Sequence, residues 1–271
     1  MTELNLPFNQ PTILDKIVAQ TREDLVQKKK RHSAADFRSF QLYEAPRRDF
    51  KAGLRKEGCI RVIAEVKKAS PSKGIIREDF DPVRIAAQYD EAGAAAISVL
   101  TEPHFFQGDL AYLGQIRPEV SVPLLRKDFI VDFYQIEEAR AAGADAILLI
   151  ATVTSGAQLS ELLHAAKEAG LQCLVECYSR DEFEALRFSE VEVVGVNNRN
   201  LKTFEVDLHR GLSLLAEAPN EVVKVSESGL STPHDIETVL EYGVDAALIG
   251  EHFMRQPHPG DALKRLTENF S

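Results

Sequence analysis

Residues 91–100, EAGAAAISVL, decide the fold because two later segments repeat their pattern. AAGADAILLI at 141–150 and EYGVDAALIG at 241–250 again place a glycine shortly before an apolar run, so that Gly93, Gly143 and Gly243 lie 50 and 100 residues apart. A glycine just past the end of a helix commonly adopts the left-handed conformation that caps it. Each repeat therefore predicts a helix that stops and an inner strand that begins.

Apolar runs and helical patterns alternate from residue 60 onward. The runs cover residues 60–66, 96–100, 122–125, 146–150, 172–176, 193–196, 223–225 and 246–249, and the helical patterns cover 82–92, 110–116, 133–142, 155–169, 180–188, 208–217, 233–242 and 261–269. Eight strands, each followed by a helix, predict an α/β fold, the (β/α)8 TIM barrel. A doubly wound sheet rarely needs eight such units and normally carries a glycine-rich dinucleotide turn after its first strand, which this chain lacks.

Residues 1–59 do not follow this alternation. Thr12 and Asp15 have the spacing of a capping box, and Ile13, Ile17 and Leu25 recur at helical spacing, which predicts a helix from about residue 12 to 31. A second helix is predicted near residues 49–56. We therefore expect a single domain over 1–271, in which 1–59 form a helical N-terminal extension of a barrel at 60–271.

Composition narrows the function classes. The 271 residues carry a net charge of -10, which disfavours nucleic acid or an anionic membrane as a partner. The N-terminus lacks a secretory signal pattern, no window approaches the roughly 18 apolar residues of a membrane span, and the three cysteines lack zinc-site spacing. We expect a cytoplasmic enzyme of small metabolites without a bound metal, working as a monomer or, alternatively, a weak homodimer.

Polar residues gather where the predicted strands end. In a parallel barrel these C-terminal ends form the active site, and they carry Glu65 and Lys67, residues 126–128, Glu176, residues 197–199, residues 227–229, and Gly250 with Glu251. Strand side chains alternate, and in each strand the inward face puts an apolar or small residue below the polar one. The alternative is a set of salt bridges that only closes the barrel mouth.

The residue types at these ends suit acid–base chemistry on an anionic, oxygen-rich substrate. Lysines donate protons or neutralise a carboxylate, and glutamates accept protons or tune the lysines by proximity. No histidine lies at a predicted strand end, and the carboxylates alternate with lysines instead of clustering with His or Asp. A histidine-based mechanism and a metal site are therefore not expected.

Two further features concern the substrate. The loops after the seventh and eighth strands of such barrels often bind phosphate, and here they contain Gly229 and Gly250, with Ser70 close by around the ring. Phe105, Phe106 and Phe129 follow the second and third strands, where they could wall a pocket for a planar ring or simply cover the loops.

The chain resembles the indole-3-glycerol phosphate synthase family. The resemblance rests on IAEVKKASPSKG at 63–74, TEPHFFQG at 101–108, PLLRKDFIVDFYQI at 123–136, LVECYS at 174–179, VGVNNRNLKTF at 194–204, VSESG at 225–229 and IGEHFM at 249–254. It implies ring closure of 1-(2-carboxyphenylamino)-1-deoxyribulose 5-phosphate, with loss of carbon dioxide and water, in tryptophan biosynthesis. It implies no cofactor, and its only implied partner is this phosphorylated aromatic substrate.

The resemblance also implies residue roles. Lys127 is the expected general acid, Glu176 its partner base, and Lys67 the lysine that contacts the substrate carboxylate and assists dehydration. Glu65, Asn197, Arg199 and Glu227 match the polar ring around the sugar, Ser228, Phe105 and Phe129 complete the substrate site, and Ser70, Gly229, Gly250 and Glu251 match the phosphate cradle. The competing hypotheses are a sugar-phosphate isomerase or epimerase on the same barrel, and a phosphate-binding barrel without activity.

Overall fold

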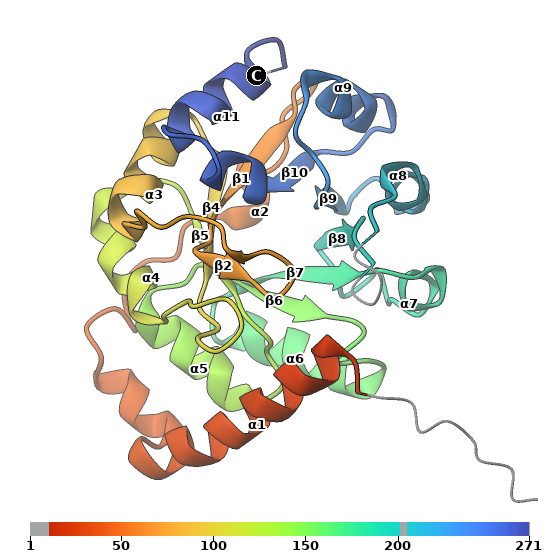
Figure 1. Cartoon of the computed structure of the whole chain (residues 1–271). Coiled ribbons are helices and arrows are strands. Elements are labelled where there is room, and N and C mark those ends of the chain that lie inside the picture. Colours follow the sequence, from red (N-terminus) through yellow and green to blue (C-terminus); the bar gives the residue numbers. More distant parts are fainter. Residues whose placement is uncertain (1–10, 201–204, 271) are drawn as a thin grey trace, which may run out of the picture.

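Eight parallel strands close into a barrel in the computed structural model, which describes residues 11–200 and 205–270 (Figure 1). In hydrogen-bonded order they are β1 (Arg61–Val66), β10 (Ala246–Ile249), β9 (Val223–Glu227), β8 (Val193–Asn197), β7 (Gln172–Cys177), β6 (Ala146–Ile150), β5 (Leu124–Lys127) and β4 (Ala96–Leu100). The closed parallel barrel confirms the predicted (β/α)8 fold.

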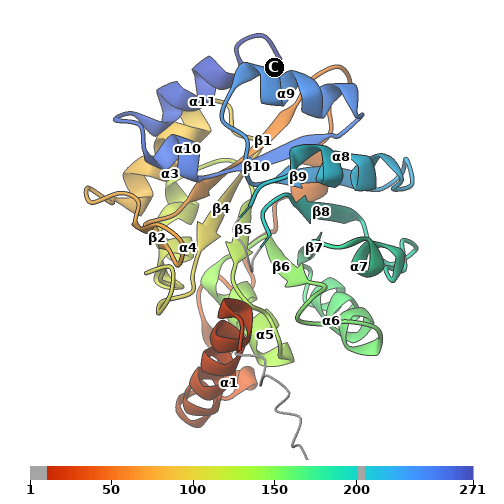
Figure 2. The same ribbon diagram turned by 45° about the vertical axis from the view of Figure 1, so that its right-hand side comes forward.

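Helices surround the strands, as the view in Figure 2 also shows. They are α3 (Pro82–Glu91), α4 (Ala111–Ile116), α5 (Phe133–Ala142), α6 (Ala157–Glu168), α7 (Arg180–Glu184), α8 (Leu208–Ala216), α9 (Pro233–Glu241) and α11 (Pro259–Thr267). Gly93, Gly143 and Gly243, which follow α3, α5 and α9, have φ values of 84°, 91° and 67°, so the three sequence repeats do mark left-handed turns at helix ends. No helix within the described residues is long and apolar enough to cross a membrane.

The core has two apolar layers. Outward-facing strand residues such as Ala64 and Val194 pack against the helices, and inward-facing ones such as Leu125 and Leu174 fill the barrel. The short helix α2 (Phe50–Gly53) lies at the N-terminal ends of the strands, where Phe50 and the following Leu54 are fully buried against the inner layer. The N-terminal extension therefore plugs the bottom of the barrel and leaves the opposite end open.

The rest of the extension packs beside α5, and the first turns of its long helix reach the open end of the barrel. It contains α1 (Ile13–Arg31) and the 3-10 helix η1 (Ala34–Ser39). The predicted capping box is present: the Thr12 hydroxyl accepts from the Asp15 amide, and the Asp15 carboxylate accepts from the Thr12 amide at 2.8 Å. Lys28 and Lys29 near the end of α1 pair with Glu138 and Asp132 of the α5 region, at 2.9 and 2.7 Å.

Three local features differ from the expectations. Strand β5 starts two residues late, at Leu124, because Pro123 has no N–H to donate to the ladder, and it continues to Lys127. The turn after β1 is a hairpin of β2 (Ala69–Ser70) and β3 (Gly74–Ile75). A short helix, α10 (Glu251–Met254), follows β10 directly. The hairpin and α10 lie at the open end of the barrel, whereas the late start of β5 lies at the opposite end.

Candidate active site

The C-terminal ends of the strands open into a cavity of about 450 Å³. The predicted site residues that line it are Glu65, Lys67, Ser70, Lys127, Phe129, Glu176, Asn197, Arg199, Glu227, Ser228, Gly229, Gly250 and Glu251. Phe105 does not line it, whereas Phe106 does. The fold thus brings together residues that are up to 186 positions apart in the chain, from Glu65 to Glu251.

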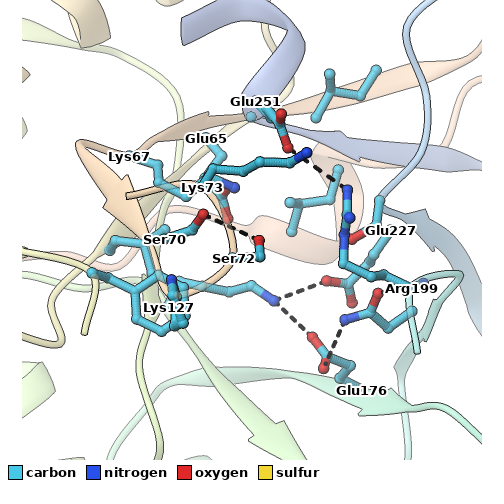
Figure 3. Close-up of a pocket in the computed structure, with 18 of the residues that line it drawn as sticks. Glu65, Lys67, Ser70, Ser72, Lys73, Lys127, Glu176, Arg199, Glu227 and Glu251 are labelled. Atoms are coloured by element: carbon cyan, nitrogen blue, oxygen red, sulfur yellow. Dashed lines mark hydrogen bonds and ion pairs between the residues drawn. The ribbon is translucent and has the colours of Figure 1, made fainter. Parts of the chain in front are cut away.

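Lys127 lies at the centre of the charged groups, between two carboxylates (Figure 3). Its Nζ donates to Glu176 Oε2 at 2.7 Å and to Glu227 Oε2 at 2.9 Å. These residues end β5, β7 and β9, alternate strands whose inward side chains reach the same level of a barrel. The Asn197 amide donates to the other oxygen of Glu176 at 3.4 Å. Lys127 is therefore held by side chains that are themselves buried.

Burial and charge act against each other in this cluster. Burial alone would lower the pKa of the Lys127 ammonium, but the nearby carboxylates outweigh it and raise that pKa well above its usual range. Burial raises the pKa of Glu227 to about 8, although Lys127 opposes the shift. For Glu176 the attraction of Lys127, with its hydrogen bond, overcomes burial and lowers the pKa. Lys127 is thus protonated and Glu176 ionised at neutral pH.

A second ion pair lies across the cavity, where Lys67 Nζ contacts Glu65 Oε2 at the end of β1. Gly250 leaves room for this carboxylate: a Cβ there would lie 2.2 Å from Glu65 Oε2. Gly195 on β8 does the same for the other side of the site, because its Cβ would lie 2.2 Å from Glu227 Oε1. Two glycines therefore make space for two of the buried glutamates.

The loop after β9 has an unusual backbone. Ser228 adopts φ 69°, a left-handed conformation that costs a non-glycine residue about 1–2 kcal/mol. Gly229 follows with φ 79°, and a Cβ there would also lie 2.3 Å from Val206 Cγ1. Strain of this kind persists where the surroundings hold it, typically at a functional site.

Hydroxyl and charged groups also line the cavity. Ser70 and Ser72 lie in the β2–β3 hairpin with their Oγ atoms 3.5 Å apart. Glu251 pairs with Arg255 at 2.9 Å and with Arg199 at 3.7 Å. Burial would raise the pKa of Glu251, but the Arg255 guanidinium outweighs it and lowers that pKa. The Glu251 carboxylate therefore stays ionised and neutralises cations beside the cavity.

Aromatic rings form another wall. Phe106 and Phe129 have ring centroids 6.1 Å apart. The loop that carries Phe106 is held by the buried carboxylate of Glu102, which accepts from the amides of residues 104, 105 and 106 at 2.9, 2.7 and 3.0 Å. Gly108 closes this loop tightly, since a Cβ there would lie 2.4 Å from the Leu100 carbonyl oxygen. In this loop Phe106, and not Phe105, lines the cavity.

Sequence reasoning missed part of the lining. Ile13, Leu14 and Ile17 of α1 reach the cavity, as do Lys73 of the hairpin and Arg255 after α10. The apolar stripe of α1 was visible in the sequence, but nothing local showed that it faces the site. No group of three or more His, Cys, Asp or Glu side chains in 11–200 and 205–270 is arranged to hold a metal ion.

Solved structures with a similar fold include a 3-hexulose-6-phosphate synthase, 14% identical with a TM-score of 0.61, which covers 78% of this chain and 100% of its own. A mutant tryptophan synthase alpha-subunit from Pyrococcus furiosus is 15% identical with a TM-score of 0.57, covering 80% of this chain and 98% of its own. At these identities the likeness shows the fold alone.

Sequence comparisons are more specific. The family model described as indole-3-glycerol phosphate synthase matches residues 14–266. An indole-3-glycerol phosphate synthase of Salinibacter ruber is 50% identical over 256 residues, 94% of this chain and 95% of that protein. One of Campylobacter jejuni is 47% identical over 261 residues, 94% of this chain and 99% of that protein. The chain belongs to the indole-3-glycerol phosphate synthase family.

Proposed function

We propose that this chain converts 1-(2-carboxyphenylamino)-1-deoxyribulose 5-phosphate to indole-3-glycerol phosphate as a decarboxylating lyase of tryptophan biosynthesis. One carbon–carbon bond forms, between the ring carbon that bears the carboxylate and C2 of the ribulose chain. One carbon dioxide and one water leave, so atoms balance without an oxidant or reductant. The observation that carries the proposal is Lys127, held by Glu176 and Glu227 inside a cavity with an aromatic wall.

Lys127 is the proposed general acid for ring closure. As the ring carbon attacks C2, negative charge develops on the carbonyl oxygen, and a positioned ammonium stabilises that charge and protonates the oxygen. Lys127 is protonated at neutral pH, as a proton donor must be, and its hydrogen bonds to Glu176 and Glu227 hold the ammonium in the cavity. Glu176, which is ionised beside it, is the proposed partner base.

Lys67 is the proposed second cation. Its ammonium binds the substrate carboxylate before carbon dioxide leaves, and loss of carbon dioxide then restores the aromatic ring. Dehydration follows: the C2 hydroxyl leaves as water with a proton from Lys67, and C1 loses a proton to a carboxylate. Glu65, the ion-pair partner of Lys67, keeps this cation in place. Asn197, Arg199 and Glu227 are proposed to bind the sugar hydroxyls and position both lysines.

The two ends of the substrate are proposed to contact different parts of the cavity wall. The anthranilate ring is proposed to lie against Phe129 and Phe106, whose paired rings suit a planar group. The phosphate is proposed to bind Ser70 with the backbone of Ser228, Gly229, Gly250 and Glu251. These residues line the same cavity. Phe105 remains a proposed substrate contact only if its loop rearranges, since it lies outside the cavity.

Turnover of the purified protein tests the proposal. Incubation with the carboxyphenylamino substrate at neutral pH should give indole fluorescence and one equivalent of carbon dioxide per indole. The phenylamino analogue without the carboxylate is the matched control and should release no carbon dioxide. Indole formation without stoichiometric carbon dioxide, or no indole at all, would overturn the assignment.

We further propose that the protein works as a cytoplasmic monomer, with every catalytic residue supplied by one chain. The proposal is supported by the cavity, whose lysines and glutamates lie on strand ends, the β2–β3 hairpin and α10 of a single chain. Light scattering on the purified protein at micromolar concentration should give the mass of one chain, and a dimer at that concentration would contradict the proposal.

A further inference from the structure

Asn198 is a buried polar residue that the proposed chemistry does not use. It directly follows β8 and is 1% exposed. Its neighbour Asn197 lines the cavity, but Asn198 does not. Because strand side chains alternate, Asn198 points outward, between the barrel and its helices. A buried amide in this position has to be explained by what it binds.

The N–H groups of Asn198 all donate to the segment around the end of β9. The Nδ2 group donates to Ser226 Oγ at 3.0 Å and to the Ser228 carbonyl at 2.9 Å. The backbone N–H of Asn198 donates to the Glu227 carbonyl at 2.8 Å. Asn198 therefore contacts three consecutive residues of β9 and its loop, including the strained Ser228.

Helix α8 fixes the side chain from the other side. A Cβ at Gly211 would lie 1.9 Å from Asn198 Oδ1, so only glycine at this position of α8 admits the amide. The Asp207 amide, just before α8, donates to the Asn198 carbonyl at 2.9 Å. Because the Ser228 carbonyl only accepts, the side-chain amide directs Nδ2 at it, which leaves Oδ1 beside Gly211 without a hydrogen-bond partner among the described residues.

This bond sets the direction of the next amide. The peptide between Ser228 and Gly229 is trans, as are all those described, so its C=O and N–H point in opposite directions. Asn198 holds the carbonyl toward the helix layer, and the Gly229 N–H is therefore directed the other way, toward the cavity that Gly229 lines. An amide aimed into a cavity in this manner is a donor for an anion.

We propose that Asn198 is a positioning residue for phosphate: by holding the Ser228 carbonyl it keeps Ser228 left-handed and aims the Gly229 N–H at the bound phosphate. The inference rests on the proposed function in that it takes the loop at 228–229 as the phosphate site. It adds a residue outside the cavity that acts on substrate affinity through the backbone, and not on the proton transfers at Lys127.

The test measures phosphate binding directly. Inorganic phosphate is titrated into wild type, Asn198→Ala and Ser226→Ala by calorimetry, and is used as a competitive inhibitor of turnover. Asn198→Ala should weaken phosphate binding and raise KM about 10-fold, the scale of one lost hydrogen bond to a preorganised loop, with kcat nearly unchanged. Ser226→Ala removes only the other acceptor of Nδ2 and should leave both constants unchanged. Equal phosphate affinity in wild type and Asn198→Ala would overturn the inference.

A double-mutant cycle separates positioning from a general loss of structure. Glycine adopts positive φ without a steric cost, so Ser228→Gly removes the need for an external restraint. Asn198→Ala should therefore weaken phosphate binding less in the Ser228→Gly background than in wild type. Effects that simply add would contradict action through Ser228. If Asn198→Ala does not fold, Gly211→Ala tests the same contact from α8 and should also weaken phosphate binding, whereas unchanged affinity would overturn the proposal.

The outcomes distinguish this inference from the proposed function. A wild-type protein that makes indole and is inhibited by phosphate, together with an Asn198→Ala variant of equal phosphate affinity, rejects only the role of Asn198. A wild-type protein that makes no indole rejects the proposed function, and phosphate binding by calorimetry still tests Asn198 in that case.

Discussion

Gly195 offers a sharp test of the site geometry, because it lies outside the cavity lining and yet governs a residue inside it. It is on β8, and a Cβ added there would lie 2.2 Å from Glu227 Oε1 and 3.1 Å from Leu174 Cδ1. Gly195→Ala therefore places a methyl group where the buried carboxylate now lies. The other oxygen of that carboxylate accepts from Lys127 Nζ at 2.9 Å. A displaced carboxylate would therefore also shift or release the ammonium of the proposed general acid.

The size of the effect follows from these distances. Ordinary contacts of a Cβ begin at 3.4 Å, so the Glu227 carboxylate must move by roughly 1 Å or more, a misplacement that typically costs about 100-fold in rate. Overpacking the same region should lower the free energy of unfolding by about 1–3 kcal/mol. We expect Gly195→Ala to fold, to lose about 100-fold in kcat, and to keep its affinity for inorganic phosphate, because the phosphate loops are not displaced.

The assay is steady-state indole formation together with urea unfolding. Gly114→Ala in α4 is the matched control, since the nearest atom to its Cβ would be Leu42 Cδ1 at 3.6 Å and activity should not change. In the Gly195→Ala background, Glu227→Asp shortens the clashing side chain and should recover part of the lost stability. Full activity of Gly195→Ala, or no coupling between its stability effect and that of Glu227→Asp, would contradict a displacement of the Glu227 carboxylate.

Three further outcomes are expected. Burial raises the pKa of the Glu227 carboxyl to about 8, so the folded protein binds this proton more tightly than the unfolded chain does. The free energy of unfolding that this proton contributes therefore falls as pH rises between roughly pH 5 and 8, by at most about 1.4 kcal/mol per pH unit. Urea unfolding should show that Glu227→Gln gains stability relative to wild type over that window, and a flat difference would contradict the shift. Phe106→Ala should raise KM for the substrate more than Phe105→Ala does, because only Phe106 lines the cavity; equal changes would argue against the aromatic wall. Phe50→Ala at the barrel bottom should lower the free energy of unfolding, measured by calorimetry or urea, by about 3–5 kcal/mol while kcat stays near wild type. A large loss of kcat in the folded variant would contradict this separation between the barrel bottom and the active site.

Much of the fold was predictable because barrel strands and helix ends leave local marks. The repeats around Gly93, Gly143 and Gly243 identified helix ends and inner strands without any structural information. Lys127 and Glu176 were predicted to lie together because both come near the C-terminal ends of strands and on their inward faces. Both properties can be read from the local sequence. Predictions that depend on the spacing of apolar residues and on the alternation of strand side chains succeeded for this reason.

The remaining features depend on contacts between distant segments. Nothing in the sequence of the Phe105–Phe106 pair says which ring turns inward; that depends on the folded loop, which Glu102 binds and Gly108 closes against Leu100. The hairpin of β2 and β3 was too short to show a period. Asn198 looked like one more polar residue at a strand end, and its link to Ser228 appears only when β8, β9 and α8 are packed together. These choices are made by tertiary packing, which a single sequence does not display.

One comparison shows whether Lys127 supplies the proton for ring closure. Wild type and Lys127→Ala are incubated with the carboxyphenylamino substrate, indole fluorescence is followed, and circular dichroism and urea unfolding are recorded on the same samples. We expect wild type to form indole, and Lys127→Ala to stay folded and to be slower by at least about 100-fold, the usual scale of a lost general acid. Wild-type turnover by folded Lys127→Ala would contradict the role of Lys127 as proton donor. A loss of activity that only follows a loss of folding would support the alternative in which these charges merely close the barrel.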